Sequence, residues 1–312
     1  MPAPTPDAPF RLGTRRSPLA MAQAEEARAR LIAAHGWAAE AIVLVPVTAS
    51  GDKIQDRSLA EIGGKALWTR ELDLCLSDGR IDAAVHSLKD VETIRPAQLV
   101  IAAVLPRADK ADVLLGARSI EALPPGALVG TSAPRRAAQL LHRRPDCRTV
   151  TFRGNVATRL AKLAAGEVQA TFLAAAGLDR LGEGGAGTRL EPADWLPAPS
   201  QGAIGIECRA DDEETRAFLE GVDHAASRAE VMAERAFLAA LGGSGHSAIA
   251  CLTSWEGGAV RLAAAIYSPD GAERIAGEIA LDPGDSEPPA ALAAELLARA
   301  PAAVRDSFQP PQ

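Results

Sequence analysis

Short apolar runs alternate with helix-forming stretches over the first two thirds of the chain, and the alternation restarts after Arg107. Such runs predict strands, and amphipathic or Pro-initiated stretches predict the helices between them. The expected strands are Arg11–Thr14, Ala41–Thr48, Ile81–His86, Leu99–Leu105, Ala127–Gly130, Thr149–Phe152, Gln169–Ala174 and Ala203–Cys208. The expected helices are Pro18–Ala34, Thr69–Ser77, Pro134–Arg144, Val156–Ala165, Gly177–Leu181 and Asp212–Leu219. This rhythm is typical of mainly parallel sheets with helices on both faces, so we expect two α/β lobes with a cleft between them.

The final third of the chain has a different pattern. Ser227 and Glu230 have the spacing of a capping box, which predicts a helix from there to about Leu241. Three β-rich runs separated by Gly-containing turns then predict an antiparallel meander: Ala248–Trp255, Val260–Tyr267 and Arg274–Ala280. Pro288–Ala300 predicts a closing helix. We therefore expect a small α+β third domain.

Composition adds three constraints. The 312 residues are 47% apolar and 23% charged, which is ordinary for a globular protein, and no apolar run is long enough for a membrane span. The net charge of −7 argues against general nucleic-acid binding. The four cysteines and five histidines lack metal-ligand spacing, so we expect no metal site, no disulfide scaffold and a reducing cytoplasmic location.

Positive charge is concentrated in one region of this acidic chain. Thr131 to Gly182 holds nine Lys or Arg against three Asp or Glu. At three places in this region an expected strand is followed by an expected helix, and each of these junctions contains arginine: Gly130–Arg136, Phe152–Arg159 and Ala174–Arg180. Two arginines in the first turn of a helix oppose its dipole unless an anion is nearby. The arrangement fits a polyanionic organic ligand, because guanidinium groups bind carboxylates well, although a solvated basic face is the plainer interpretation.

A second candidate lies after the expected strand that ends at His86. The sequence His86-Ser87-Leu88-Lys89-Asp90 places a cation beside a carboxylate where a strand ends. Such a pair can bind an anionic ligand and transfer a proton or stabilise a cation. A surface turn with incidental charges would have the same sequence.

Seven ordered stretches together resemble the porphobilinogen deaminase (hydroxymethylbilane synthase) family over nearly the full chain. They are Gly13–Ala20, Gly63–Trp68, Val85–Val91, Gly130–Arg136, Arg153–Val156, Ala176–Leu181 and Pro197–Arg209. The resemblance implies a transferase that condenses four porphobilinogen molecules head to tail, with loss of ammonia, during haem biosynthesis. It also implies a monomer that uses a dipyrromethane cofactor, and together with the composition we expect a cytoplasmic protein with no nucleic-acid or membrane partner.

The resemblance further implies a fold and a set of site residues. Two lobes would resemble periplasmic binding proteins, with domain 1 at 8–105 and 200–222, domain 2 at 106–199, and domain 3 at 223–308. The catalytic carboxylate of the family falls on Asp90. Substrate or cofactor binding falls on Arg15, Ser17, Lys65, Ser87, Lys89, Thr131, Ser132, Arg135, Arg136, Arg153, Arg159, Gly177, Arg180 and Gln201.

One position departs from the family pattern. The resemblance places Gly245 where the family has the cysteine that carries the cofactor as a thioether, and glycine has no nucleophile. The chain then uses another anchor, such as Ser244 or Cys251, or a primer held without a covalent bond. Alternatively, it is a divergent paralogue that binds porphobilinogen or a bilane without turnover, or Gly245 is a changed residue in an otherwise normal enzyme.

Overall fold

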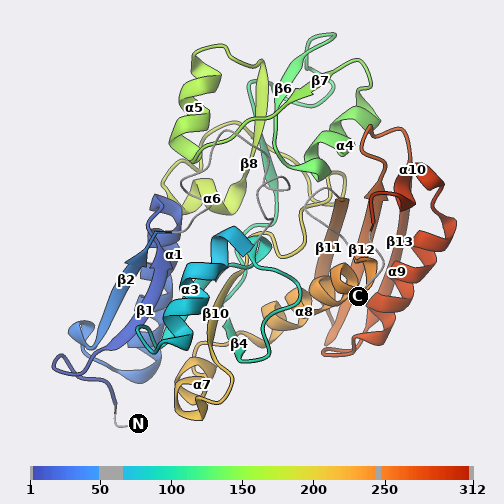
Figure 1. Cartoon of the computed structure of the whole chain (residues 1–312). Coiled ribbons are helices and arrows are strands. Elements are labelled where there is room, and N and C mark those ends of the chain that lie inside the picture. Colours follow the sequence, from blue (N-terminus) through green and yellow to red (C-terminus); the bar gives the residue numbers. More distant parts are fainter. Residues whose placement is uncertain (1–2, 49–65, 243–246, 309–312) are drawn as a thin grey trace. The chain divides into compact units, whose positions relative to one another are not determined.

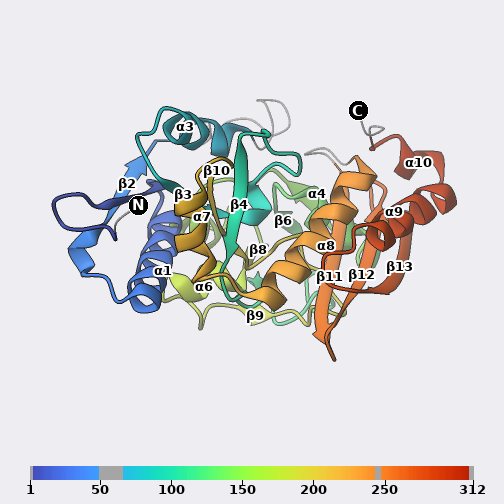
Figure 2. The ribbon, with the colours of Figure 1, turned by 90° about the horizontal axis from the view of Figure 1, so that it is seen from below.

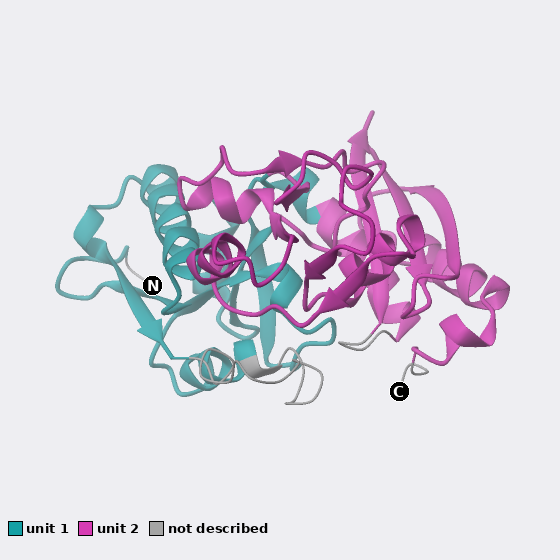
Figure 3. Ribbon diagram, turned by 90° about the horizontal axis from the view of Figure 1, so that it is seen from above, with its two compact units in different colours: residues 1–54, 65–108, 203–228 teal, residues 55–64, 109–202, 229–312 magenta. Residues whose placement is uncertain are grey.

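A computed structural model describes residues 3–48, 66–242 and 247–308 (Figure 1). Lys65, Ser244, Gly245 and His246 lie outside the described residues. The chain forms two compact units (Figure 3). Unit 1 comprises residues 1–54, 65–108 and 203–228, and unit 2 comprises residues 55–64, 109–202 and 229–312. The chain therefore returns to unit 1 after completing the first part of unit 2.

Unit 1 is built on a five-stranded sheet in the order β2-β1-β3-β10-β4. Its strands are β1 (Phe10–Arg15), β2 (Ile42–Val47), β3 (Ala83–Ser87), β4 (Leu99–Val104) and β10 (Ile204–Arg209). β1 is parallel to β2 and β3, whereas β10, from the returning segment, is antiparallel to both of its neighbours. The expectation of a mainly parallel sheet holds except for this interior strand.

Helices cover both faces of the unit 1 sheet, as expected (Figure 2). The helices are α1 (Pro18–His35), α3 (Ala66–Ser77) and α7 (Glu213–Glu220), with short 3₁₀ turns at Ala39–Ala41 and Leu88–Asp90. α1 and α7 share one core that includes Leu31 and Leu219, while α3 contributes Leu72 and Leu76 to the other. Ser17 caps α1, because its hydroxyl accepts the backbone N–H of Ala20 at 3.3 Å.

The first part of unit 2 has a second five-stranded sheet, in the order β7-β6-β8-β5-β9. Its strands are β5 (Asp112–Leu115), β6 (Leu128–Gly130), β7 (Arg148–Val150), β8 (Ala170–Ala174) and β9 (Thr188–Arg189). Its helices are α4 (Pro134–Arg143), α5 (Val156–Ala164) and α6 (Ala175–Arg180). β6, β7 and β8 are parallel, but β5 pairs antiparallel with both β8 and the edge strand β9. The sequence pattern predicted neither β5 nor β9.

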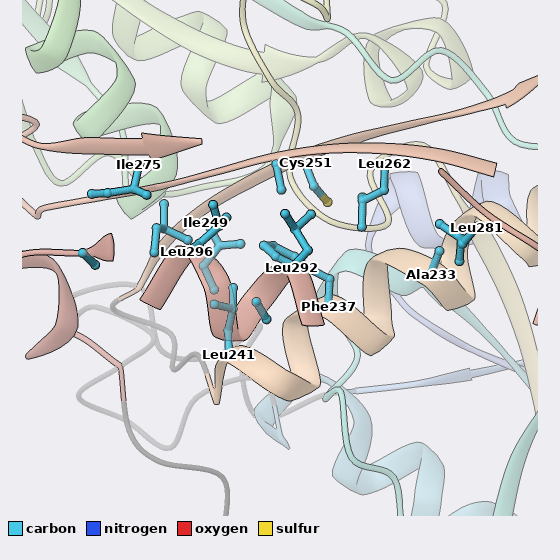
Figure 4. Packing of buried hydrophobic residues seen from close by; sticks show 14 of the residues in the cluster. Ala233, Phe237, Leu241, Ile249, Cys251, Leu262, Ile275, Leu281, Leu292 and Leu296 are labelled. Atoms are coloured by element: carbon cyan, nitrogen blue, oxygen red, sulfur yellow. The ribbon is translucent and has the colours of Figure 1, made fainter. Parts of the chain in front are cut away.

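The remainder of unit 2 is the expected antiparallel meander packed on helices. It consists of α8 (Ala225–Leu241), whose first four residues belong to unit 1, β11 (Ala248–Glu256), β12 (Ala259–Tyr267), β13 (Arg274–Leu281), α9 (Glu287–Arg299) and α10 (Ala302–Arg305). α8 and α9 cover one face of the sheet around Phe237 and Leu292, as Figure 4 shows. On the other face, Ala138 of α4 packs against Ala250 and Ala265, so both parts of unit 2 share apolar contacts.

The predicted capping box is wrong, because α8 begins at Ala225, two residues before Ser227. His224 precedes the helix, and its Nδ1 accepts the backbone N–H of Ser227 at 3.3 Å. Glu230 instead pairs with Lys110, with 2.6 Å between Nζ and Oε2. The His224 side chain thus takes the capping role that the Ser–Glu spacing predicted for Ser227.

Candidate active site

The 3₁₀ turn Leu88–Asp90 directly follows β3 and is anchored by Leu88. The Leu88 side chain is buried, and its backbone N–H donates to the Ala203 carbonyl at 3.1 Å. A Cβ atom on Gly205 of β10 would lie 2.4 Å from a Leu88 methyl carbon, so only glycine allows this close packing. With Leu88 held inside, Lys89 and Asp90 are half-buried on the turn. The Asp90 carboxylate makes no ion pair with the residues that the structure describes.

A buried charge network lies under this turn. His86 Nε2 lies 3.0 Å from Glu207 Oε2, and Arg95 Nε donates to Glu207 Oε1 at 2.8 Å. The Arg95 guanidinium also donates to Asp73 at 2.6 Å and to Glu92 at 2.8 Å. The network joins β3, β10, α3 and the segment after Asp90. It therefore ties the candidate catalytic turn to the sheet and to α3.

Burial and the neighbouring positive charges shift the pKa of Glu207 in opposite directions. Burial raises the pKa of this carboxyl, but His86 and Arg95 stabilise its ionised form more strongly, and its pKa falls from 4.5 to about 2. The ionised form is therefore the one that this network requires. Glu207 lies in a run that the family resemblance covers, but its role was missed, because only the sheet order places it beside His86.

We expect Glu207→Gln to remove part of the acid sensitivity of folding. A depressed carboxyl pKa adds stability above pH 4.5, and that contribution is lost as the pH falls toward about 2. The shift corresponds to about 3 kcal/mol. Urea unfolding of the wild type at pH 7 and pH 3 should show more than half of this loss, because pH 3 still lies above the folded pKa, and the variant should show a smaller difference between the two pH values.

Asp78→Asn is the matched control for this experiment, because Asp78 is an exposed carboxylate that pairs with the exposed Arg80. Its acid response should match that of the wild type. If the stability of Glu207→Gln changed with pH as much as that of the wild type, the assignment of a depressed pKa to Glu207 would be contradicted.

The other predicted residues of unit 1 lie near the ends of β1 and β3. Arg15 ends β1, and its guanidinium carbon lies 4.0 Å from the centroid of the Trp68 ring. Ser17 is engaged as the cap of α1, and Ser87 ends β3. These residues bring hydroxyl and cationic groups to strands that are adjacent and parallel.

In unit 2, the anion beside Arg135 and Arg136 is a carboxylate of the protein itself. Both are buried, and their guanidinium groups donate to the Asp112 carboxylate at 2.7 Å. Trp195 Nε1 and Gln201 Nε2 also donate to Asp112, each at 2.9 Å. We call these five residues the Asp112 cluster. The helix dipole argument had pointed to a bound anionic ligand, but the anion that lies beside the two arginines is the Asp112 carboxylate.

The Asp112 cluster determines the protonation state of the Asp112 carboxyl. Burial raises the pKa of Asp112, but the Arg135 and Arg136 charges hold it well below its ordinary value. Arg135, Arg136 and Gln201 therefore have internal partners, and their contact with a ligand stays a prediction. Sequence reasoning missed Asp112, although a single carboxylate in the apolar run Ala111–Leu115 was a usable signal.

The remaining predicted residues of unit 2 cluster after β6, β7 and β8. These strands are parallel, so the turns that follow them lie at one edge of the sheet. Ser132 accepts the backbone N–H of Phe152 at 3.0 Å, which joins the first turn to the segment that bears Arg153. Thr131 accepts the N–H of Ala133 at 3.2 Å.

Two further arginines of this edge bond to nearby backbone. Arg159 Nε donates to the Gly154 carbonyl at 2.9 Å. Arg180 Nη2 donates to the Gly202 carbonyl at 3.3 Å, and Gly177 is buried in α6. The edge thus gathers hydroxyl and guanidinium groups that suit carboxylate ligands.

Two features are absent from the residues that the structure describes. No helix there has the length and apolar character to cross a membrane. No group of three His, Cys, Asp or Glu side chains there could hold a metal ion.

Comparison with known proteins identifies the class to which this fold and site belong. The family model described as "Porphobilinogen deaminase, dipyromethane cofactor binding domain" matches residues 10–217, and "Porphobilinogen deaminase, C-terminal domain" matches residues 228–298. The chain therefore belongs to the porphobilinogen deaminase family, which confirms the resemblance. Dipyrromethane is the cofactor of this family.

Two relatives are similar along almost their whole length. Porphobilinogen deaminase of Sphingopyxis alaskensis is 57% identical over 97% of this chain and 98% of its own. Porphobilinogen deaminase of Paracoccus denitrificans is 50% identical over 96% and 97%. Among solved structures, a substrate-binding domain of a putative amino acid ABC transporter from Streptococcus pneumoniae aligns with a TM-score of 0.40 and 12% identity, over 69% of this chain and 91% of that one.

Proposed function

We propose that this chain is a hydroxymethylbilane synthase, a transferase of tetrapyrrole biosynthesis. It would condense four porphobilinogen molecules head to tail, release ammonia at each step and yield hydroxymethylbilane. Membership of the family and the near full-length relatives named porphobilinogen deaminase support the proposal.

The observation that carries the proposal is the half-buried Asp90 carboxylate beside Lys89 on an anchored turn. Loss of ammonia from porphobilinogen leaves an electron-poor azafulvene cation, which a nearby carboxylate stabilises. The same carboxylate can take the proton that the attacking pyrrole loses. Because Leu88 and the network under the turn hold the backbone, the carboxylate is placed before the substrate arrives.

Acetate and propionate groups of the substrate need cationic and hydroxyl partners. We assign this role to Lys89, Arg15, Ser17 and Ser87 in unit 1, and to Thr131, Ser132, Arg153, Arg159 and Arg180 in unit 2. We assign the same role to Lys65, because the family resemblance implies it. Arg135, Arg136 and Gln201 would act from the Asp112 cluster beneath the strand ends, where their burial keeps them in place.

The setting of this activity is also proposed. All four cysteines are buried and unoxidised, which suits a reducing cytoplasm. The net charge of −7 supports a small-molecule substrate and no nucleic-acid partner, and the family resemblance suggests a monomer.

A turnover assay tests the proposal directly. The purified protein is incubated with porphobilinogen, the mixture is oxidised, and uroporphyrin absorbance is measured; product is expected. Binding of porphobilinogen without product, in both the wild type and Gly245→Cys, would contradict the proposal. That outcome would favour the alternative, a paralogue that binds porphobilinogen without catalysis.

A further inference from the structure

The structure leaves no accessible thiol to which a cofactor could be joined. The chain has four cysteines, and the structure describes all of them as buried. Cys75 and Cys208 are 3% and 0% exposed, and Cys147 and Cys251 are 4% and 0% exposed. Residues 243–246 read Gly-Ser-Gly-His and add no thiol. A thioether to dipyrromethane therefore does not fit the residues present.

Cys251 is the cysteine nearest in sequence to Gly245, and its environment excludes it as an anchor. It lies on β11, inside the core that α8 and α9 form, among Phe237, Leu262 and Leu292 (Figure 4). Its backbone N–H donates to the Pro197 carbonyl at 3.0 Å, so the strand is held on that side as well. A dipyrrole with acetate and propionate groups cannot enter this apolar space, because burial of unpaired carboxylates is very costly.

The other three cysteines are also enclosed, and burial makes two of them poor nucleophiles. The thiolate, and not the thiol, attacks carbon. Burial raises the pKa of Cys208 to about 11 and also raises the pKa of Cys147. Cys75 belongs to the apolar cluster under α3, with Leu72 and Leu76. Each thiol thus acts as a small buried apolar side chain.

We infer that this chain holds its dipyrromethane by ion pairs and hydrogen bonds alone, as a dissociable primer. The inference rests on the proposed function. The carboxylates of the primer match the hydroxyl and guanidinium groups after β6, β7 and β8, among them Ser132, Arg153 and Arg159. Charge-assisted bonds of this kind bind an anion firmly in the folded protein but break when it unfolds.

Mass spectrometry tests the inference without relying on turnover. The wild type is incubated with porphobilinogen or with a synthetic dipyrromethane that bears acetate and propionate groups. Under denaturing conditions, the expected mass is that of the bare chain, whereas native conditions should show a dipyrrole complex. After gel filtration, turnover should fall and then return when the synthetic dipyrromethane is added.

Two variants serve as reference and control. Gly245→Cys should gain a dipyrrole adduct that survives denaturation, and Ser244→Cys, with the same thiol one residue away, should remain bare. An adduct that survives denaturation on any residue of the wild type would overturn the inference. So would a native mass that stays that of the bare chain with saturating dipyrromethane. Absence of turnover in the wild type and in Gly245→Cys is a separate result that contradicts the proposed function, while the wild-type masses still decide how the primer is held.

Discussion

Asp90→Asn is expected to lower porphobilinogen turnover by about 10²- to 10⁴-fold, the range typical for removal of a positioned acid–base group. The amide has the size of the carboxylate but cannot accept the pyrrole proton or offset a developing positive charge. Lys89 and the arginines are unchanged, so porphobilinogen affinity should change much less than turnover. Product formation and ligand binding, measured on the same preparation, check the two parts of this prediction.

Asp78→Asn is the matched control for Asp90→Asn. Asp78 follows α3, is exposed and pairs with Arg80 at 3.1 Å. Its replacement should leave turnover unchanged. If Asp90→Asn retained wild-type turnover, Asp90 would not be the catalytic carboxylate. If it lost binding as completely as turnover, its role would be to hold the substrate.

Asp112→Asn is expected to destabilise unit 2 by about 3–5 kcal/mol, the usual effect of breaking a buried ion pair. Asp112 is fully buried and accepts hydrogen bonds from Arg135, Arg136, Trp195 and Gln201. The amide would present a donor to these donors and leave two guanidinium groups without a counter-charge. Such groups cost more when left buried and unpaired than the pair contributes when intact.

Urea unfolding measures this loss, and tryptophan fluorescence follows it, since the Trp195 indole, one of four in the chain, donates to Asp112 and stacks on Phe172. Glu278→Gln is the control, because it removes one carboxylate of an exposed pair with Arg261 on the meander. That change should cost no more than about 1 kcal/mol. Equal destabilisation by the two substitutions would show that the cluster contributes no more than a surface pair.

Local features of the fold followed from the sequence with little error. The Ser17-Pro18 start of α1 and the meander β11 to β13 are examples, because caps, turns and apolar periodicity act within a few residues. Prediction of the α8 start failed for a related reason. Two overlapping local signals competed there, and His224 accepted the N–H of Ser227 in place of the expected Ser–Glu box.

Contacts between distant segments could not be predicted from local pattern. β10 inserts between β3 and β4 of the unit 1 sheet from about 100 residues downstream of β4 and brings Glu207 to His86. The anion beside Arg135 and Arg136 comes from Asp112 of β5; a lone carboxylate in an apolar run signals a buried partner but does not say which residues pair with it. No periodicity encodes such pairings, because they depend on strand order and register.

The sequence by itself determined the family, the α/β character, the Asp90 turn and the absence of a cysteine at position 245, because residue identity and short spacing carry these properties. The tertiary structure decided which charges have partners inside the protein and which thiols are out of reach. Burial and pairing arise only when segments far apart in the chain pack together. That packing placed Asp112 between two arginines and enclosed Cys251 in an apolar core.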